Sequence, residues 1–273
     1  MELAILFWFY KKVDVCEDRL KLLKKYNPNL KIYGLYGGEE KEEEIFRKRL
    51  GKYLDDFYMS KEKDSFKKWI EGEMVLVEWY KNRGKNLKWD SVVMAQWDLL
   101  SFKSFKKIFE GIKKDEIYLP NYGVVDPDFE ERWSWTSKKK DDERPKGNPN
   151  KPYGRKMYLE FKEHVNKNYK FNEYLPVSIF MIAVLPRIFF KRFSGLKNKK
   201  LGFLEYKLPT YAKIFGIKRF GRELDEISKC QNDFPMNAEE KEILKQDIEL
   251  ELSKPKGFRI FHPYFKKYKM PNK

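Results

Sequence analysis

The start of the chain limits its fold more than any other feature. The apolar run LAILFWFY at residues 3–10 is too short for an ordinary helix and does not alternate with polar residues, so it predicts a strand buried on both faces. From Val13 to Leu23 apolar residues recur at steps of three and four, as on one face of a helix. The run LKIYGLYGG then predicts a second strand that its glycines end. This order predicts parallel strands joined by a crossover helix.

The alternation of strand and helix patterns continues to about residue 100. Residues 39–59 begin as an acidic helix and end in a short strand at 57–59. Residues 65–89 carry another apolar helical face, and the apolar run at 91–95 predicts a further buried strand. This alternation predicts an α/β fold with a mostly parallel central sheet flanked by helices. A chain of 273 residues can form it as a single domain, 1–273.

The second half has a less regular pattern. Residues 137–156 are charged and rich in proline and glycine, which predicts a mobile loop. The longest apolar stretch, residues 175–190, is interrupted by Pro186 and is shorter than the about 20 residues that a membrane-spanning helix needs. We expect it to be a core helix. Near the C-terminus, Asn237 is expected to cap a further helix.

The chain is strongly basic. Its 58 Lys and Arg residues outnumber its 42 Asp and Glu residues, which gives a net charge of +16. Such a charge suits nucleic acid, an anionic membrane surface or an anionic substrate such as a phosphate ester, or it is only a solvated surface. The segment RIFFKRF at residues 187–193 mixes cations with aromatic rings, as segments at a membrane surface do.

Cysteine content and the N-terminal sequence indicate the compartment. Cys16 and Cys230 lie far apart, so they form neither a disulfide framework nor a zinc knuckle. The N-terminus has no basic region and no cleavage site of a signal peptide. We therefore expect a cytoplasmic protein, peripheral to the membrane if the segment RIFFKRF binds lipid.

Asp98 is the first candidate for a functional residue. It follows the apolar run at residues 91–95, so it falls at the carboxyl end of a strand, where open α/β sheets bind their ligands. A carboxylate there can hold a divalent cation that bridges the diphosphate of a nucleotide. The alternative is an ordinary edge aspartate that caps a loop.

The order of these elements resembles a known family. A strand–helix–strand opening, GLYGG after the second strand and QWDLL near residue 100 resemble the GT-A type of glycosyltransferase, the nucleotide-diphospho-sugar transferase fold. The resemblance implies a nucleotide-sugar-binding half at residues 1–130 and an acceptor half at 157–273. It also implies a D-x-D motif whose last aspartate binds Mn²⁺ or Mg²⁺. This sequence has Gln96-Trp97-Asp98, and an amide supplies no charge in place of the first acid.

The resemblance also implies a second metal ligand and a base. Members of the family often supply a late histidine to the metal, and His262 in FRIFHPYFK fits that position; a structural histidine is the alternative. Inverting members need a carboxylate to deprotonate the acceptor hydroxyl. Glu205 has apolar neighbours, which raise a carboxyl pKa and favour proton transfer. Its alternative is an ion pair with Lys207, and a retaining enzyme would not need this base.

The nucleotide is expected near the end of the first strand. By the same resemblance Phe9, Tyr10 and Lys11 meet the base or ribose, with Gln96 and Trp97 beside them. Arg83 lies before the strand that leads to Asp98 and has the fork geometry that pairs with phosphate. Each of these residues has an alternative as a core aromatic or a solvated cation.

The sequence therefore predicts a glycosyltransferase that moves a sugar from a UDP- or GDP-sugar to a glycan or lipid-linked acceptor, assisted by Mn²⁺ or Mg²⁺. A catalytically inactive protein of the same shape is an alternative, because of Gln96. A nucleic-acid-binding protein that uses the basic surface is another. A metal-dependent nuclease is a third, since Glu-x-Lys triplets occur at 160–162 and 205–207. Phosphate-binding P-loop, dinucleotide-binding and serine-hydrolase motifs are absent from the sequence.

Overall fold

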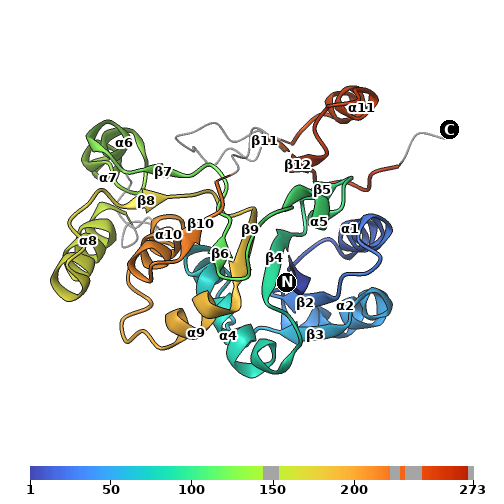
Figure 1. Cartoon of the computed structure of the whole chain (residues 1–273), viewed down its shortest axis with the longest axis horizontal. Helices are drawn as coiled ribbons and strands as arrows, with labels where there is room; N and C mark the ends of the chain where they lie inside the picture. The colour runs from blue at the N-terminus through green and yellow to red at the C-terminus, as the bar shows by residue number, and fades with distance from the viewer. Residues whose placement is uncertain (144–153, 222–227, 231–241, 270–273) are drawn as a thin grey trace.

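A five-stranded sheet lies at the centre of the protein, whose computed structural model describes residues 1–143, 154–221, 228–230 and 242–269 (Figure 1). The sheet has the order β3-β2-β1-β4-β9. Its first four strands are parallel, and β9 is antiparallel to β4. The strands of this sheet are β1 (Leu3–Phe9), β2 (Ile32–Tyr36), β3 (Asp56–Met59), β4 (Ser91–Gln96) and β9 (Ile182–Pro186). The expected α/β fold with a mostly parallel sheet flanked by helices is confirmed.

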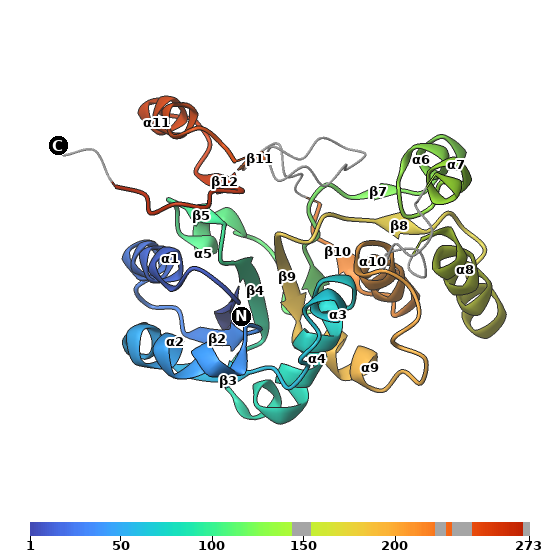
Figure 2. The same ribbon diagram turned by 180° about the vertical axis from the view of Figure 1, so that it is seen from behind.

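Helices cover both faces of this sheet. Figure 2 shows α1 and α2 on one side, and α3, α4, α9 and α10 on the other. The bounds of the helices are α1 (Val13–Tyr26), α2 (Glu43–Leu50), α3 (Ser65–Ile70), α4 (Gly72–Asn82), α5 (Phe105–Ile108), α6 (Pro127–Arg132), α7 (Lys138–Asp142), α8 (Arg155–Tyr169), α9 (Arg187–Ser194), α10 (Leu204–Ile214) and α11 (Lys245–Ser253). Short 3₁₀ turns occur at η1 (Glu40–Glu42), η2 (Gly51–Tyr53) and η3 (Gly84–Asn86).

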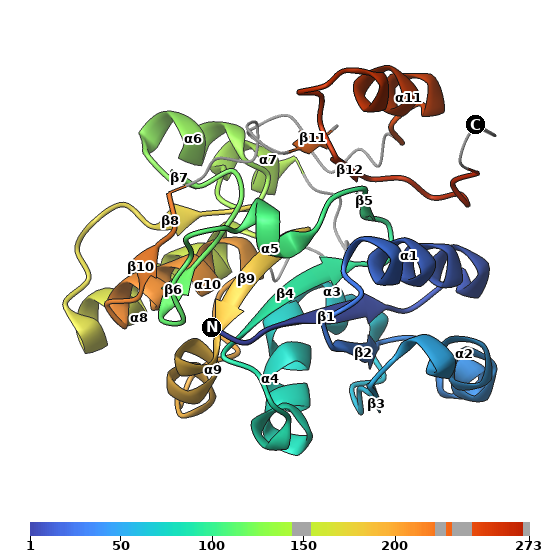
Figure 3. The same cartoon turned by 45° about the vertical axis from the view of Figure 1, so that its right-hand side comes forward.

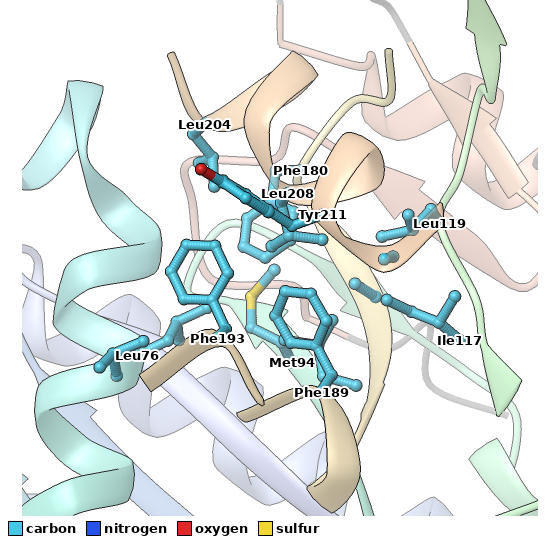
Figure 4. Close-up of a cluster of buried hydrophobic side chains, with 14 of the residues drawn as sticks. Leu76, Met94, Ile117, Leu119, Phe180, Phe189, Phe193, Leu204, Leu208 and Tyr211 are labelled. Carbon is cyan, nitrogen blue, oxygen red and sulfur yellow. The ribbon is translucent and has the colours of Figure 1, made fainter. Parts of the chain in front are cut away.

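The continuous apolar pattern of the first strand has a simple cause. Every residue of β1 is buried, because successive side chains enter two different cores. Leu6 and Trp8 pack into the core with α4, α9 and α10, whereas Phe7 and Phe9 pack into the core with α1 and α2. Figure 4 shows the first core, where Met94 of β4 lies among aromatic rings from α9 and α10.

The longest apolar stretch forms a strand rather than the expected core helix. Residues 182–186 are β9, which pairs with β4 and sets Val184 opposite Val93. Pro186 ends the strand and stands just before α9, a place that its missing N–H allows. Phe189, Phe190 and Phe193 of α9 are at most 2% exposed, so the aromatic rings of RIFFKRF are core residues and are not available to a membrane.

Two further expectations concern the second half. The region expected to be a mobile loop, 137–156, contains α7, which Ser137 caps, and the start of α8; its residues 144–153 lie outside the described ranges. The expected helix cap at Asn237 also lies outside them. The helix observed near that point is α11.

A second, small sheet brings the C-terminal region to the end of β4. Its order is β11-β12-β5, and β12 runs antiparallel to β5 (Figure 3). The short strands are β5 (Leu100–Ser101), β6 (Glu116–Ile117), β7 (Gly123–Val124), β8 (Pro176–Val177), β10 (Lys218–Arg219), β11 (Ser228–Cys230) and β12 (Ile260–His262). Among the described residues, no helix has the length and apolar character that crossing a membrane requires.

Candidate functional site

The carboxyl ends of the parallel strands meet at one edge of the central sheet. Phe9, Tyr36, Met59 and Gln96 are the last residues of β1, β2, β3 and β4. Ligands of open α/β sheets bind at this edge. The residues that follow these strands are therefore the ones to examine for a site.

Asp98 and His262 lie side by side at this edge. After β4 the chain turns at Trp97 and Asp98 and enters β5, where Leu100 pairs with Phe261 of β12. This pairing sets His262 beside the turn. Its Nε2 atom lies 3.5 Å from Oδ1 of Asp98, and both residues are less than 10% exposed.

The neighbours of Asp98 keep its carboxylate ionised. Burial raises the pKa of Asp98, but the adjacent His262 ring and the Arg19 guanidinium lower it further than burial raises it, so the carboxylate stays ionised. Its Oδ1 atom is buried and accepts no hydrogen bond from the described residues. A carboxylate and an imidazole are both metal ligands. Within the described ranges no third histidine, cysteine or acid joins them, so a metal ion here would need oxygen ligands from a substrate or water.

Gln96 ties the end of β4 to the chain before β9. Its side-chain amide donates to the carbonyl oxygen of Phe180 at 2.7 Å, and its backbone N–H donates to that of Met181. The amide stands where a D-x-D motif has its first carboxylate. Because a carboxylate cannot donate a hydrogen bond to a carbonyl, the glutamine has a structural function that an aspartate would lack.

Trp97 is the centre of a cluster of rings and lysines. The indole is 1% exposed and stacks on Phe265, with ring centroids 5.8 Å apart, while Tyr10 meets its edge. The ammonium groups of Lys11 and Lys12 lie 5.1 and 5.7 Å from the indole centroid, within the range of cation–π attraction. Trp97 therefore holds two cations next to Asp98 rather than offering its own face to a ligand.

A cavity of about 580 Å³ opens beside Tyr10, at the ends of β1, β2 and β3. This volume suits a small-molecule ligand. The side chain of Tyr10 is 41% exposed, so it can contact a bound molecule. The cavity is lined by Tyr10, Lys11, Gly37, Gly38, Glu39, Glu40, Glu42, Met59, Ser60, Lys61, Glu62, Lys63 and Lys68.

Lys68 shapes the wall of this cavity, and sequence reasoning missed it. Its Nζ atom donates to the carbonyl oxygens of Gly37 and Gly38 at 2.8 and 3.3 Å. Burial lowers its pKa. Gly38 is also constrained, since a Cβ atom there would lie 2.3 Å from Oη of Tyr36 and 2.6 Å from the carbonyl oxygen of Tyr10. The glycine pair after the second strand was noted in the sequence, but nothing there indicated the lysine that binds it.

Two predicted nucleotide contacts lie elsewhere. Phe9 is fully buried and packs against Tyr36 and Phe46 in the core. Arg83 follows α4 and pairs with Asp56, the first residue of β3, at 3.5 Å, so it lies at the amino edge of the sheet. The structure therefore brings Tyr10, Lys11, Gln96 and Trp97 to the carboxyl edge with Asp98 and His262, but not Phe9 or Arg83.

Glu205 lies in the first turn of α10 and is partly buried. Burial raises its pKa to about 8. Its carbonyl oxygen accepts the N–H of Ser178 at 2.9 Å, and the same stretch supplies the carbonyl of Phe180 to Gln96. The residues between β8 and β9 thus connect the start of α10 to the carboxyl end of β4.

The alternative ion pair of Glu205 with Lys207 is not formed. Lys207 is fully buried and instead pairs with Glu73 of α4 at 2.5 Å. This pair connects a helix of the first half to the helix that carries Glu205. No sequence signal pointed to it, because the two residues lie far apart in the chain.

The nuclease alternative is not supported. Both Glu-x-Lys triplets lie within helices, residues 160–162 in α8 and 205–207 in α10. Residues two apart on a helix do not face each other, so neither triplet can place its glutamate and lysine at one metal. The nucleic-acid alternative is not supported either, because the lysines of the described structure form no separate nucleic-acid-binding module.

Several solved structures are similar to this chain at low sequence identity. No family model and no curated protein matches the chain. An active-site mutant of LgtC is similar in structure, with a TM-score of 0.47, 10% identity, and coverage of 96% of this chain and 86% of that one. The galactosyltransferase LgtC with donor and acceptor sugar analogues has a TM-score of 0.44, 9% identity and coverages of 84% and 76%.

A mouse protein gives similar values. Xyloside xylosyltransferase 1 has a TM-score of 0.44, 9% identity, and coverage of 95% of this chain and 97% of that one. These similarities concern the path of the backbone as a whole. They assign no role to any residue of the site described above.

Proposed function

We propose that this protein is a glycosyltransferase that moves a sugar from a nucleoside-diphosphate sugar to an acceptor hydroxyl. The observation that carries the proposal is the Asp98–His262 pair, which lies at the carboxyl edge of the parallel sheet together with a cavity of about 580 Å³. A buried ionised acid, an imidazole and two lysines at one edge suit a diphosphate better than a neutral ligand.

In this proposal the nucleoside occupies the cavity. Tyr10 offers an exposed ring at its wall, and the backbone at Gly37 and Gly38 allows close approach because no side chain projects there. Lys68 fixes that backbone. The diphosphate then extends from the end of β1 toward Asp98, past the ammonium groups of Lys11 and Lys12.

Asp98 and His262 would hold Mn²⁺ or Mg²⁺. The imidazole favours Mn²⁺, because Mg²⁺ prefers oxygen ligands. When bound, the ion neutralises charge on the departing nucleoside diphosphate. The residues of the chain do the remaining work: Lys11 and Lys12 add positive charge near the same group, and the buried surroundings strengthen these interactions.

Glu205 is proposed as the base of an inverting reaction. Its carboxylate would take the proton of the acceptor hydroxyl as the oxygen attacks the anomeric carbon and the bond to the diphosphate breaks. A pKa of about 8 makes it a stronger base than an ordinary glutamate. The acceptor is proposed to be a glycan hydroxyl. The lipid-linked acceptor loses its main support, since the aromatic residues of α9 are buried.

Calorimetric titration of UDP and GDP, each with and without Mn²⁺, tests the proposal. We expect one nucleotide to bind only with the ion, and Asp98→Ala to abolish that binding. Asp115→Ala is the matched control, because Asp115 is an exposed aspartate. If neither nucleotide binds the wild-type protein while an oligonucleotide binds and is released by salt, the proposal is wrong and the basic charge indicates the function.

A further inference from the structure

One buried side chain binds the segment that follows His262 to α1. Arg19 of α1 is 1% exposed. Its Nη2 atom donates to the carbonyl oxygens of Tyr264 and Lys266 at 2.6 and 2.8 Å. Its Nη1 atom lies 2.5 Å from the Asp18 carboxylate, which in turn accepts the N–H of Tyr268 at 3.0 Å.

The same segment contacts the candidate site. The N–H of Tyr264 donates to the carbonyl oxygen of Asp98 at 2.9 Å, and the ring of Phe265 stacks on Trp97. Tyr264 thus accepts a hydrogen bond from Arg19 and donates one to Asp98. The guanidinium and the proposed metal ligand are connected through a single residue.

The strand that carries His262 does not fix this histidine to Asp98 by itself. The pairing of β12 with β5 covers Ile260 and Phe261 and ends before His262. On its other side β12 pairs with β11, where His262 is opposite Cys230, so this pairing makes no bond to Asp98. The contacts that follow His262 in the chain, such as the hydrogen bond from Tyr264 to Asp98, add to this pairing and help to hold His262 in position relative to Asp98.

Substitution of Arg19 should disturb the contacts around it, because its side chain is buried. Hydrogen bonds offset the cost of burying a guanidinium, and two of the three that Arg19 donates go to the backbone of the C-terminal segment. Without Arg19 the two carbonyl oxygens would lose a charged donor, and each such bond contributes more than a neutral one. The segment would then keep its hydrogen bond from Tyr268 to Asp18 but lose its attachment to α1 at Tyr264 and Lys266.

We propose that Arg19 is a positioning residue that holds His262 against Asp98 through the segment after β12. The effect of Arg19 on metal binding rests on the proposed function, but its effect on the position of His262 does not. Mutation of residues that orient metal ligands typically lowers metal affinity by about 10- to 100-fold. We expect Arg19→Gln to weaken Mn²⁺ binding by that amount.

The two histidines of the chain make a direct test practical. The ring signals of His164 and His262 are recorded by NMR at one fixed pH, without metal, in proteins with and without Asp98→Asn. In the wild-type background we expect Asp98→Asn to shift the His262 signal and leave the His164 signal in place. In the Arg19→Gln background the His262 signal should no longer respond to Asp98→Asn.

Two further variants make the result decisive. Arg49→Gln is the matched control, because Arg49 also pairs with acids of α1, Asp14 and Glu17, but not with the C-terminal segment; it should behave like the wild type. Arg19→Lys keeps a cation and should restore part of the response of the His262 signal to Asp98→Asn. It replaces Arg19→Gln in the test if that variant does not fold.

The outcomes separate the two proposals. An equal His262 response to Asp98→Asn with and without Arg19 overturns the positioning role. If the wild-type protein binds no Mn²⁺, the metal assignment of the proposed function is wrong, while the ring signals still decide the role of Arg19. Loss of the response together with weaker Mn²⁺ binding supports both.

Discussion

The Nε2 atom of His262 lies 3.5 Å from the Oδ1 atom of Asp98, although β4 lies in the first half of the chain and β12 near its C-terminus. Two short strands, β5 and β12, produce this contact. The buried carboxylate of Asp98 lies beside this imidazole, and its Oδ1 atom accepts no hydrogen bond from the described residues, so the pair can take a further partner. A cation and a diphosphate would complete it, and the following predictions test that interpretation.

Loss of either side chain should weaken metal binding. We expect Asp98→Asn and His262→Gln each to lower the affinity for Mn²⁺ about tenfold or more, in line with the effect of disturbing a metal site. Free Mn²⁺ measured by electron paramagnetic resonance gives the affinity. His164→Gln is the matched control, because His164 lies on α8 and should leave Mn²⁺ binding unchanged. Equal affinity in all three variants would contradict the assignment.

Glu205 should control the pH dependence of transfer. Its pKa of about 8 means that the base form increases as the pH rises through 8, so the turnover number should rise between pH 7 and 9. Glu205→Gln should lower turnover by about 10²- to 10⁴-fold, remove this rise and leave nucleotide affinity unchanged. A turnover number that rises with pH in Glu205→Gln as it does in the wild type would show that another group is the base.

The same residue should affect stability in a predictable direction. Its folded-state pKa of about 8 exceeds the ordinary glutamate value of 4.5, so between these values the folded state binds a proton that the unfolded state has lost. The free energy of unfolding therefore falls as the pH rises through this window. Glu205→Gln should be more stable than the wild type at pH 9, and the difference should shrink toward pH 5, as measured by urea unfolding.

The Glu73–Lys207 pair should stabilise the protein only when it is complete. Both side chains are at most 1% exposed, so Lys207→Met would leave a buried carboxylate unpaired at a cost of about 3–5 kcal/mol. The double variant Glu73→Leu/Lys207→Met should recover most of that loss in urea unfolding. A double variant as unstable as the single one would mean that packing, rather than charge, is responsible.

Gly38 should be needed for the shape of the cavity. Gly38→Ala places a Cβ atom 2.3 Å from Oη of Tyr36, so the loop must move, at a cost of about 1–3 kcal/mol. The displaced loop lines the cavity, so we expect nucleotide binding to weaken by about tenfold, which corresponds to about 1.4 kcal/mol. Gly51→Ala is the control, since nothing lies within 4 Å of a Cβ atom there. Equal nucleotide affinity in both variants would place the nucleotide elsewhere.

The first half of the fold could be predicted because its strands and helices differ clearly in period. The run at residues 182–186 could not, since a fully buried strand and a buried helix segment have the same apolar composition. Asp98 and His262 were predicted as metal ligands from their residue types and the resemblance, and the structure brings the two side chains together. Lys68, Glu73 and Arg19 were missed, since each acts through partners that are distant in the sequence, and no local pattern records a tertiary contact.

The pairing of β12 with β5 also has a consequence for biosynthesis. A chain is made from its N-terminus, and early parts can fold while later ones are still being added. The cavity at the ends of β1, β2 and β3 can therefore form well before His262 emerges. Until β12 joins β5, a newly made protein has the cavity but lacks the imidazole beside Asp98.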